Sequence, residues 1–206
     1  MLKKVLVTGG AGFVGSHLCK RLVKDENYVL CLDNFFTGSR DNVAELLDNP
    51  KFKIVTHDVV NPFHTDVDEI YNLAAQSSVA LSFKDPLGTI ESTAVGAAVL
   101  FEAVRQCCPA AHLFQASSSD MFGEQLGETL KREDSRFCPK SPYAVSKVFA
   151  HQLAKNYRDS YGLHFSSAIL FNHESPLRTP AFVTMKIVMG AVSAIKNSGE
   201  VLELGN

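Results

Sequence analysis

A tyrosine and a lysine, Tyr143 and Lys147, stand four residues apart in a stretch with helical periodicity, so they share one helix face. A tyrosine accepts a proton from a hydroxyl group only when it approaches its tyrosinate form near neutral pH. Lowering a phenol pKa from about 10 to about 7 requires roughly 4 kcal/mol. An ammonium group at ~4 Å, in a medium of effective dielectric 20, supplies about that much. The pair therefore suits removal of a hydroxyl proton while hydride leaves the same carbon; the alternative is an exposed pair without chemical function.

A serine cluster followed by Asp120 ends an apolar segment that is typical of a buried strand. The carboxyl ends of strands are where open α/β sheets hold ligands and catalytic groups. The hydroxyl of Ser118 can hydrogen-bond the reacting oxygen beside Tyr143. Asp120 adds a carboxylate that simple alcohol oxidation does not require and that suits a second proton transfer next to a new ketone. The alternative is that Asp120 only caps a turn.

A glycine-rich turn follows the first apolar run and has the pattern G-x-x-G-x-x-G at the start of a helix. Gly9 permits the tight turn, Gly12 lets the backbone approach a pyrophosphate, and Gly15 lets the helix pack on the strand. The helix N-terminus at Phe13 and Val14 offers N–H groups and a partial positive charge to phosphates. This context predicts a dinucleotide site; a mononucleotide-binding or ligand-free α/β domain is the alternative.

The second predicted strand ends in Asp33, where a carboxylate accepts hydrogen bonds from ribose hydroxyls and repels a 2′-phosphate. This position favours NAD over NADP, and Arg40 nearby softens the preference. Further residues that follow strands two to four are predicted to contact the same cofactor: Asn34, Asp58, Val59, Leu73, Ala74 and Ala75.

Short apolar runs alternate with helical patterns along the whole chain. The predicted strands are Val5–Val7, Tyr28–Leu32, Phe52–Val55, Glu69–Leu73, His112–Gln115 and Phe165–Leu170. The predicted helices are Val14–Leu22, Val43–Leu47, Thr93–Val104, Tyr143–Tyr161 and Phe182–Ile195. Such alternation predicts an α/β fold, with a doubly wound parallel sheet of the Rossmann type covered by helices on both faces. The long segment between Gly123 and Pro142 is predicted to be a lid over the site.

The composition is that of a globular protein, with 206 residues, 46% apolar residues, 20% charged residues and a net charge of −2. Without a basic block we expect no nucleic-acid partner. The apolar runs are strand-length, so we expect no membrane span. Five cysteines lack metal-ligand spacing, so we expect no metal and a reduced, cytoplasmic protein. Cys19 and Cys31 are expected to pack as small hydrophobic residues.

At these residues the sequence resembles the extended short-chain dehydrogenase/reductases that modify nucleotide sugars. Residues 3–70 resemble UDP-glucuronate decarboxylases and UDP-glucose 4-epimerases, and residues 69–206 are closer to GDP-mannose 4,6-dehydratase. The motifs that carry the second resemblance are Glu69–Ser77, Ser141–Tyr143, Leu170–Pro176, Phe182–Ile187 and Leu204–Asn206.

The resemblance implies a dehydratase mechanism. Tyr143 removes the proton from the sugar 4-hydroxyl as hydride moves to the nicotinamide, and Asp120 then removes the C5 proton and helps to expel the C6 hydroxyl as water. Ser118 and Asp120 stand at positions that are threonine and glutamate in the family. The resemblance also implies a homodimer, held by a four-helix bundle of the helices at 93–104 and 143–161. It assigns the nucleotide sugar to Ser118, Asn172, Arg178, Val183 and Lys186.

The resemblance divides the chain into an NAD(P)-binding Rossmann domain at 1–171 and a partial, truncated nucleotide-sugar-binding region at 172–206. The leading hypothesis is a GDP-mannose-type 4,6-dehydratase. Two alternatives stay open at this point: a UDP-sugar decarboxylase or epimerase, and a non-catalytic NAD-binding scaffold with a partner enzyme.

Overall fold

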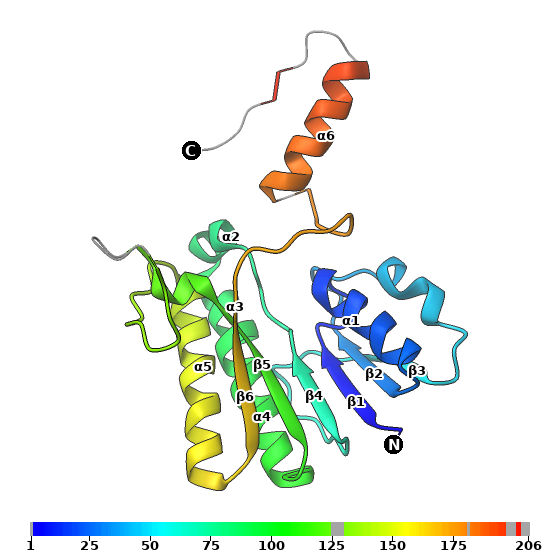
Figure 1. Cartoon of the computed structure of the whole chain (residues 1–206), viewed down its shortest axis with the longest axis vertical. Coiled ribbons are helices and arrows are strands. Elements are labelled where there is room, and N and C mark those ends of the chain that lie inside the picture. The colour runs from blue at the N-terminus through cyan, green and yellow to red at the C-terminus, as the bar shows by residue number, and fades with distance from the viewer. Residues whose placement is uncertain (1, 125–129, 181, 197–200, 203–206) are drawn as a thin grey trace. The chain divides into compact units, whose positions relative to one another are not determined.

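The chain forms two compact units, Met1–Phe171 and Asn172–Asn206 (Figure 1). The structure is a computed structural model that describes residues 2–124, 130–180, 182–196 and 201–202. The predicted marker Leu204–Asn206 and part of the predicted lid, residues 125–129, lie outside the described residues. The contact boundary falls after Phe171, and the predicted division into a cofactor domain and a sugar-binding region stays a prediction. The ligands predicted for each unit stay predictions.

The first unit is built on one sheet of parallel strands in the order β3-β2-β1-β4-β5-β6 (Figure 1). The strands are β1 (Lys4–Thr8), β2 (Tyr28–Asp33), β3 (Phe52–Thr56), β4 (Glu69–Asn72), β5 (His112–Ser118) and β6 (His164–Leu170). The strand order reverses direction between β1 and β4, and ligands of open α/β sheets bind at the carboxyl ends of the strands at such a switch point. The α/β, Rossmann-type prediction is therefore confirmed.

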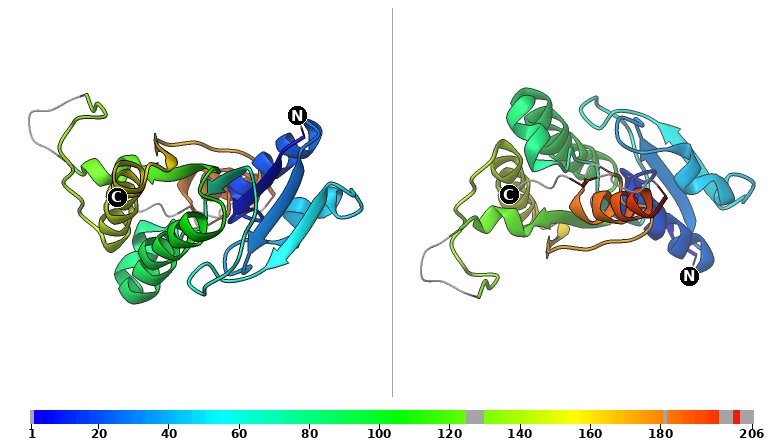
Figure 2. Two further views of the ribbon diagram at one scale, coloured as in Figure 1. Left: turned by 90° about the horizontal axis from the view of Figure 1, so that it is seen from below. Right: turned by 90° about the horizontal axis from the view of Figure 1, so that it is seen from above.

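Helices cover both faces of this sheet (Figure 2). On one face lie α4 (Gly96–Cys107) and α5 (Pro142–Tyr161), and on the other lie α1 (Phe13–Lys24) and the 3-10 helix η1 (Arg40–Leu46). The segment around Val43 was predicted as an ordinary helix. It is a 3-10 helix whose start is capped by Ser39, whose hydroxyl accepts a hydrogen bond from the Asp41 N–H at 3.2 Å.

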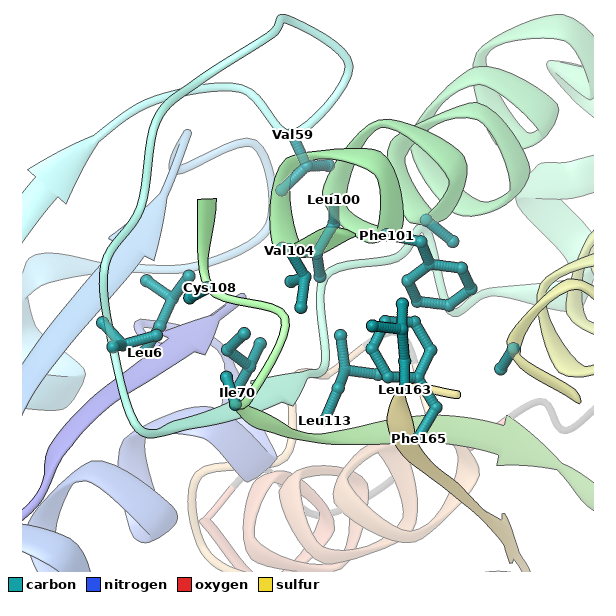
Figure 3. Close-up of a cluster of buried hydrophobic side chains, with 14 of the residues drawn as sticks. Leu6, Val59, Ile70, Leu100, Phe101, Val104, Cys108, Leu113, Leu163 and Phe165 are labelled. Atoms are coloured by element: carbon teal, nitrogen blue, oxygen red, sulfur yellow. The ribbon is translucent and has the colours of Figure 1, made fainter. Parts of the chain in front are cut away.

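Successive strand residues point to opposite faces of the sheet, and two cores result. Leu6, Ile70, Leu113 and Phe165 stand opposite one another on neighbouring strands and pack against α4 and α5 (Figure 3). The second core, on the α1 side, includes residues such as Val5, Val7, Cys19 and Cys31. Both cysteines are fully buried there, which confirms that they pack as small hydrophobic residues.

Two short helices that the sequence analysis missed precede α4. They are α2 (Val79–Lys84) and α3 (Pro86–Ile90), and a π-helical turn η2 (Glu91–Val95) joins α3 to α4. The segment at 85–88 lies outside every helix predicted from the sequence, but Asp85 caps α3 by accepting a hydrogen bond from the Gly88 N–H at 3.0 Å. Pro86 then suits the first helical position, where no N–H donor is needed. The combination of Asp and Pro here starts a helix.

The run from Pro86 to Cys107 is long and apolar enough to cross a membrane by length and composition. It corrects the expectation that all apolar runs of the chain are strand-length. Half of its most apolar window is buried inside the protein, which is the behaviour of a core helix that packs on a sheet. The run is therefore weak evidence for a membrane span.

Thr93 lies in the π-helical turn, and its side chain is buried at 2% exposure. Among the described residues its hydroxyl has no hydrogen-bond partner. A buried, unpaired hydroxyl costs about 1–3 kcal/mol, so we expect Thr93→Val, which keeps the shape, to raise the free energy of unfolding by about 1 kcal/mol. Urea unfolding measures this change. A loss of stability would show that the hydroxyl has a partner in solution, and Thr89→Val, which breaks a bond to Gln76 at 3.0 Å, is the destabilising control.

The second unit contains the helix α6 (Val183–Lys196), which agrees with the predicted helix within one residue at each end. None of the described residues of this helix is buried. Leu202 packs against it at Gly190, where an added Cβ atom would stand 2.7 Å from a Leu202 methyl carbon. The apolar side chains of α6 otherwise face outward within this unit.

Candidate active site

The turn after β1 forms a backbone cradle at the carboxyl edge of the sheet. Gly9 has a φ of 66°, a left-handed conformation that favours glycine, and its N–H donates to the Leu32 carbonyl at 2.8 Å. An added Cβ atom at Gly15 would stand 2.1 Å from the Gly9 oxygen. Gly15 therefore lets α1 pack on the turn itself, which refines the predicted contact with the strand.

The start of α1 faces this turn with backbone amides. Gly12 is its N-terminal cap residue, and no side chain caps the helix there. The first-turn amides of a helix, here those of Val14 and Gly15, have no carbonyl acceptor within the helix. A turn closed by glycines and a helix start without a capping side chain fit a pyrophosphate. The residues present thus fit the predicted dinucleotide.

Asp33 stands at the end of β2 and is buried, with 6% exposure. One carboxylate oxygen accepts a hydrogen bond from the Ala11 N–H at 2.9 Å, and the other accepts one from the Phe35 N–H at 2.8 Å. The carboxylate therefore ties the glycine turn to the end of β2. The Arg40 guanidinium lies over the Phe35 ring, 4.8 Å from its centroid. A positive charge is thus present next to the predicted ribose position.

The strand ends beside Asp33 carry the other predicted cofactor residues. Asn34 donates to the Asp58 carboxylate at 2.9 Å, so these two predicted residues lie together. The Val59 side chain is buried in the core against Gly96, which leaves only its backbone for a ligand. An added Cβ atom at Gly9 would stand 2.9 Å from the Ala74 nitrogen. The glycine turn therefore meets the segment from Leu73 to Ala75, as expected for one continuous site.

Tyr143 and Lys147 lie on the first turns of α5, which starts with Pro142 behind the cap residue Ser141. Both side chains are buried, and the Lys147 Nζ lies 5.8 Å from the centroid of the Tyr143 ring. The Nζ donates to the Ala116 carbonyl at 2.9 Å. Burial lowers the pKa of Lys147 from 10.5 to about 8. The amine is thus held in place near the phenol.

Ser118 and Asp120 lie together just after β5. Ser118 caps the 3-10 helix η3 (Ser119–Phe122) and accepts from the Asp120 N–H at 3.2 Å. Its hydroxyl donates to the Asp120 carboxylate at 3.2 Å. The capping role considered for Asp120 therefore belongs to Ser118. The Asp120 side chain is on an exposed residue at the strand end, open to a ligand.

Sequence reasoning missed a contact between β5 and α5. Ser117 Oγ and His151 Nδ1 are 2.8 Å apart, and His151 stands one helical turn beyond Lys147. Burial, followed by the charges of Arg158 and Lys155, lowers the pKa of His151. The spacing of Tyr143, Lys147 and His151 at every fourth residue was visible in the sequence, but the serine that meets the imidazole was not.

The C-terminal part of the predicted lid, around Phe137 and Cys138, contacts η3. The Cys138 N–H donates to the Met121 carbonyl at 2.9 Å, and Phe137 packs on the ring of Phe122 at 5.4 Å between centroids. The rings of Phe137 and His151 meet edge to face, with 5.3 Å between their centroids. The segment therefore closes over the end of β5 on its way to Tyr143, and its role as a lid stays a prediction.

The remaining predicted sugar residues, Asn172, Arg178, Val183 and Lys186, all belong to the second unit. The Arg178 guanidinium lies 3.4 Å from the centroid of the Phe182 ring, and its Nε is 3.6 Å from a Glu174 carboxylate oxygen. Val183 and Lys186 are exposed on α6. Their assignment to a nucleotide sugar stays a prediction.

The family model described as GDP-mannose 4,6 dehydratase matches residues 6–206 of the chain. The chain belongs to this family. A GDP-mannose 4,6-dehydratase of Sinorhizobium fredii (strain HH103) is 36% identical over 220 residues, which cover 99% of this chain and 62% of the relative. The chain therefore spans about three fifths of the length of that relative.

Solved structures of nucleotide-sugar enzymes have the same fold. A UDP-N-acetylglucosamine 4-epimerase from Methanobrevibacter ruminantium M1 superimposes with a TM-score of 0.87 and 30% identity, over 100% of this chain and 66% of the epimerase. A dTDP-glucose 4,6-dehydratase from Streptomyces venezuelae, solved with NAD bound, gives a TM-score of 0.84 and 26% identity over 93% of this chain and 62% of that one. The predicted membership in the nucleotide-sugar short-chain dehydrogenase/reductases is confirmed.

Proposed function

We propose that the first unit binds a nicotinamide dinucleotide, NAD in preference to NADP, at the carboxyl edge between β1 and β4. Gly9, Gly12 and Gly15 with the start of α1 would hold the pyrophosphate, and Asp33 would accept from the ribose hydroxyls. The related dehydratase from Streptomyces venezuelae was solved with NAD, which supports this choice. The bound cofactor supplies a hydride acceptor and donor.

We propose that the chain acts as a nucleotide-sugar 4,6-dehydratase of the GDP-mannose type. Tyr143 takes the proton from the sugar 4-hydroxyl, and Lys147 beside its ring favours the tyrosinate. The Ser118 hydroxyl hydrogen-bonds the same oxygen. Asp120, exposed at the strand end, removes the C5 proton that the 4-ketone makes acidic and assists loss of the C6 hydroxyl as water. Hydride would pass from C4 to the bound cofactor during the oxidation and return to C6 after the loss of water, while a proton returns to C5, so the product is a 4-keto-6-deoxy sugar and the cofactor regains its starting form. The observation that carries the proposal is the pairing of a buried lysine and tyrosine with a carboxylate at one strand end.

The same constellation admits two other functions. A UDP-sugar epimerase or decarboxylase uses a similar tyrosine and lysine, and the likeness to the Methanobrevibacter epimerase favours it. A cofactor-binding scaffold would need no substrate at all. We therefore propose to incubate the purified chain and NAD with GDP-mannose, UDP-glucose and UDP-glucuronate, and to identify products by mass.

Each outcome of this assay assigns one function. Loss of 18 mass units, about one water, from GDP-mannose supports the dehydratase, because a 4-keto-6-deoxy sugar differs from its parent by one water. Loss of carbon dioxide or a C4 epimer supports the alternative enzymes. Binding of NAD without any turnover supports the scaffold, and it contradicts the dehydratase proposal when a full-length relative is active under the same conditions.

Asp33→Asn is expected to relax the preference for NAD over NADP by about tenfold or more. Like charges a few Å apart cost on the order of 1 kcal/mol or more even in water, so removal of the carboxylate lowers the repulsion of a 2′-phosphate. Asparagine retains an acceptor for the Ala11 or the Phe35 N–H, so the turn keeps part of its support. Fluorescence titration with both cofactors measures the ratio of dissociation constants. An unchanged ratio contradicts the ribose assignment, and Asp41→Asn, on an exposed residue of η1, is the control.

We propose that two copies of the chain associate through α2, α3 and α5, which pack on one another in the first unit. These helices expose large apolar side chains that a second copy would cover, namely Val79, Phe83, Leu87, Ile90, Val145 and Phe149. Single exposed apolar residues are ordinary, but a contiguous set marks a binding surface. The four-helix bundle predicted from the sequence consists of the helices at 93–104 and 143–161 from each copy, and it shares α5 with this surface.

The double substitution Leu87→Glu and Phe149→Glu is expected to convert the dimer into a monomer. Each copy would carry two added carboxylates at an interface that excludes water. Like charges brought together there weaken the association by several kcal/mol. Sedimentation velocity measures the mass in solution. A monomeric parent chain, or a variant that stays dimeric, contradicts the proposed surface. Leu47→Glu, at an exposed leucine outside these helices, is the control and leaves the mass unchanged. The cytoplasmic location stays a prediction.

A further inference from the structure

A row of buried polar side chains crosses three neighbouring strands of the first unit. Thr8, Asn72 and Gln115 stand directly opposite one another in the registers of β1, β4 and β5. They lie two residues beyond Leu6, Ile70 and Leu113, hence on the same face, toward α4 and α5. All three are at most 3% exposed. Along the strands, the apolar core thus gives way to a layer of polar side chains nearer the carboxyl edge of the sheet.

Hydrogen bonds run through this row in one direction. The Thr8 hydroxyl donates to Asn72 Oδ1 at 2.6 Å, and the Asn72 amide donates to Gln115 Oε1 at 2.7 Å. The Gln115 amide donates to the carbonyl of Ala116 at 2.9 Å. At the other end, the Ala74 N–H donates to the Thr8 hydroxyl at 3.3 Å. Aligned hydrogen bonds in a dry environment polarise and reinforce one another.

The row ends at the atom that holds the lysine. The carbonyl of Ala116 accepts from Gln115 and also from Lys147 Nζ, both at 2.9 Å. β4 ends opposite Gln115, so Ala116 and the two serines after it pair only with β6. The Ala116 peptide group therefore has a neighbouring strand on one side only, and fewer backbone hydrogen bonds fix its orientation. The Gln115 amide supplies a second contact to the carbonyl.

We propose that Thr8, Asn72 and Gln115 are positioning residues that orient the Ala116 carbonyl and thereby hold Lys147 against Tyr143. The row begins next to Gly9 of the glycine turn and ends at the lysine, so it joins the two halves of the proposed site. An apolar row of the same shape would fill the same space and stabilise the sheet. It would not direct the carbonyl. The inference rests on the proposed function for its effect on turnover.

The test compares one break in the row with replacement of the whole row. Asn72→Leu removes the acceptor of the Thr8 O–H and the donor to Gln115 Oε1 in a buried layer, so its urea midpoint is expected to fall. The triple variant Thr8→Val, Asn72→Leu and Gln115→Met removes every member with shape retained, so its midpoint is expected to return toward the parent value. Turnover is expected to fall at least about tenfold in both variants, since misplacement of a catalytic group by ~1 Å costs up to a hundredfold. KM and NAD affinity are expected to stay within about twofold.

A readout without substrate separates this inference from the proposed function. The pH midpoint of tyrosinate absorption, taken as the difference from Tyr143→Phe in the presence of NAD, is expected to rise by about one unit when the ammonium is no longer held beside the phenol. Ile70→Val, in the apolar row, is the control that lowers stability and leaves this midpoint unchanged. A triple variant with parental turnover and midpoint would show that the row is only structural. If the parent chain turns over no nucleotide sugar, the proposed function fails and the tyrosinate midpoint alone decides the inference.

Discussion

Replacement of Tyr143 by phenylalanine is expected to lower turnover by about 10²–10⁴-fold while NAD affinity stays within about twofold. The substitution deletes only the phenol oxygen, which is the group that accepts the proton from the sugar hydroxyl. The ring is buried at 7% exposure, and phenylalanine fills the same space beside Lys147. Steady-state rates with the substrate found in the product screen, together with fluorescence titration of NAD, measure both quantities.

Tyr157→Phe is the matched control for this experiment because it removes a phenol oxygen from the same helix. The Tyr157 hydroxyl donates to the Glu102 carboxylate at 3.3 Å, far along α5 from the proposed site. Its loss is expected to leave turnover unchanged. Equal losses of turnover and NAD affinity in Tyr143→Phe would instead show that this tyrosine supports the fold of the site and takes no part in proton transfer.

Lys147→Met is expected to abolish turnover and yet to stabilise the ligand-free chain near neutral pH. Burial lowers the pKa of Lys147 from 10.5 to about 8, so the folded chain holds an ammonium that its surroundings disfavour. The difference corresponds to roughly 3 kcal/mol. Methionine fills a similar volume without charge, and loss of the hydrogen bond to the Ala116 carbonyl offsets about 1 kcal/mol. A net gain of about 2 kcal/mol is expected in urea unfolding.

This gain is expected to shrink as the pH rises. Between the folded pKa of about 8 and the unfolded value of 10.5, the unfolded chain binds more protons at Lys147 than the folded chain does. Stability of the parent therefore increases with pH across this window, and the methionine variant lacks that increase. The two curves are expected to cross before about pH 10.5, because the parent gains about 3 kcal/mol across this window against an initial difference of about 2 kcal/mol. Lys155→Met, at an exposed lysine of the same helix, is the control without a pH-dependent difference. A destabilised Lys147→Met at neutral pH would contradict the burial argument.

The sequence by itself determined the order of strands and helices and the residues at the strand ends. Apolar runs of strand length, the glycine spacing and the Tyr143–Lys147 spacing are local patterns. Such patterns can be recognised in the sequence without knowing which residues they contact in the folded chain. Two local features were not predicted correctly, namely the start of α3 and the contact of Gly15. Asp85 and Pro86 start a helix at a position outside every predicted helix. Gly15 was expected to pack against the strand, and it lies against the backbone of the glycine turn.

Only the tertiary structure decided which side chains share a hydrogen bond across strands. Thr8, Asn72 and Gln115 are separated by more than forty residues at each step, and parallel pairing brings them into one row. The same holds for Ser117 with His151 and for the Ala116 carbonyl with Lys147. A hydrogen bond requires a donor and an acceptor within about 3 Å, and strand register fixes such distances. The residue types that could do chemistry are therefore written in the chain, whereas the network that holds them follows from the pairing of the strands.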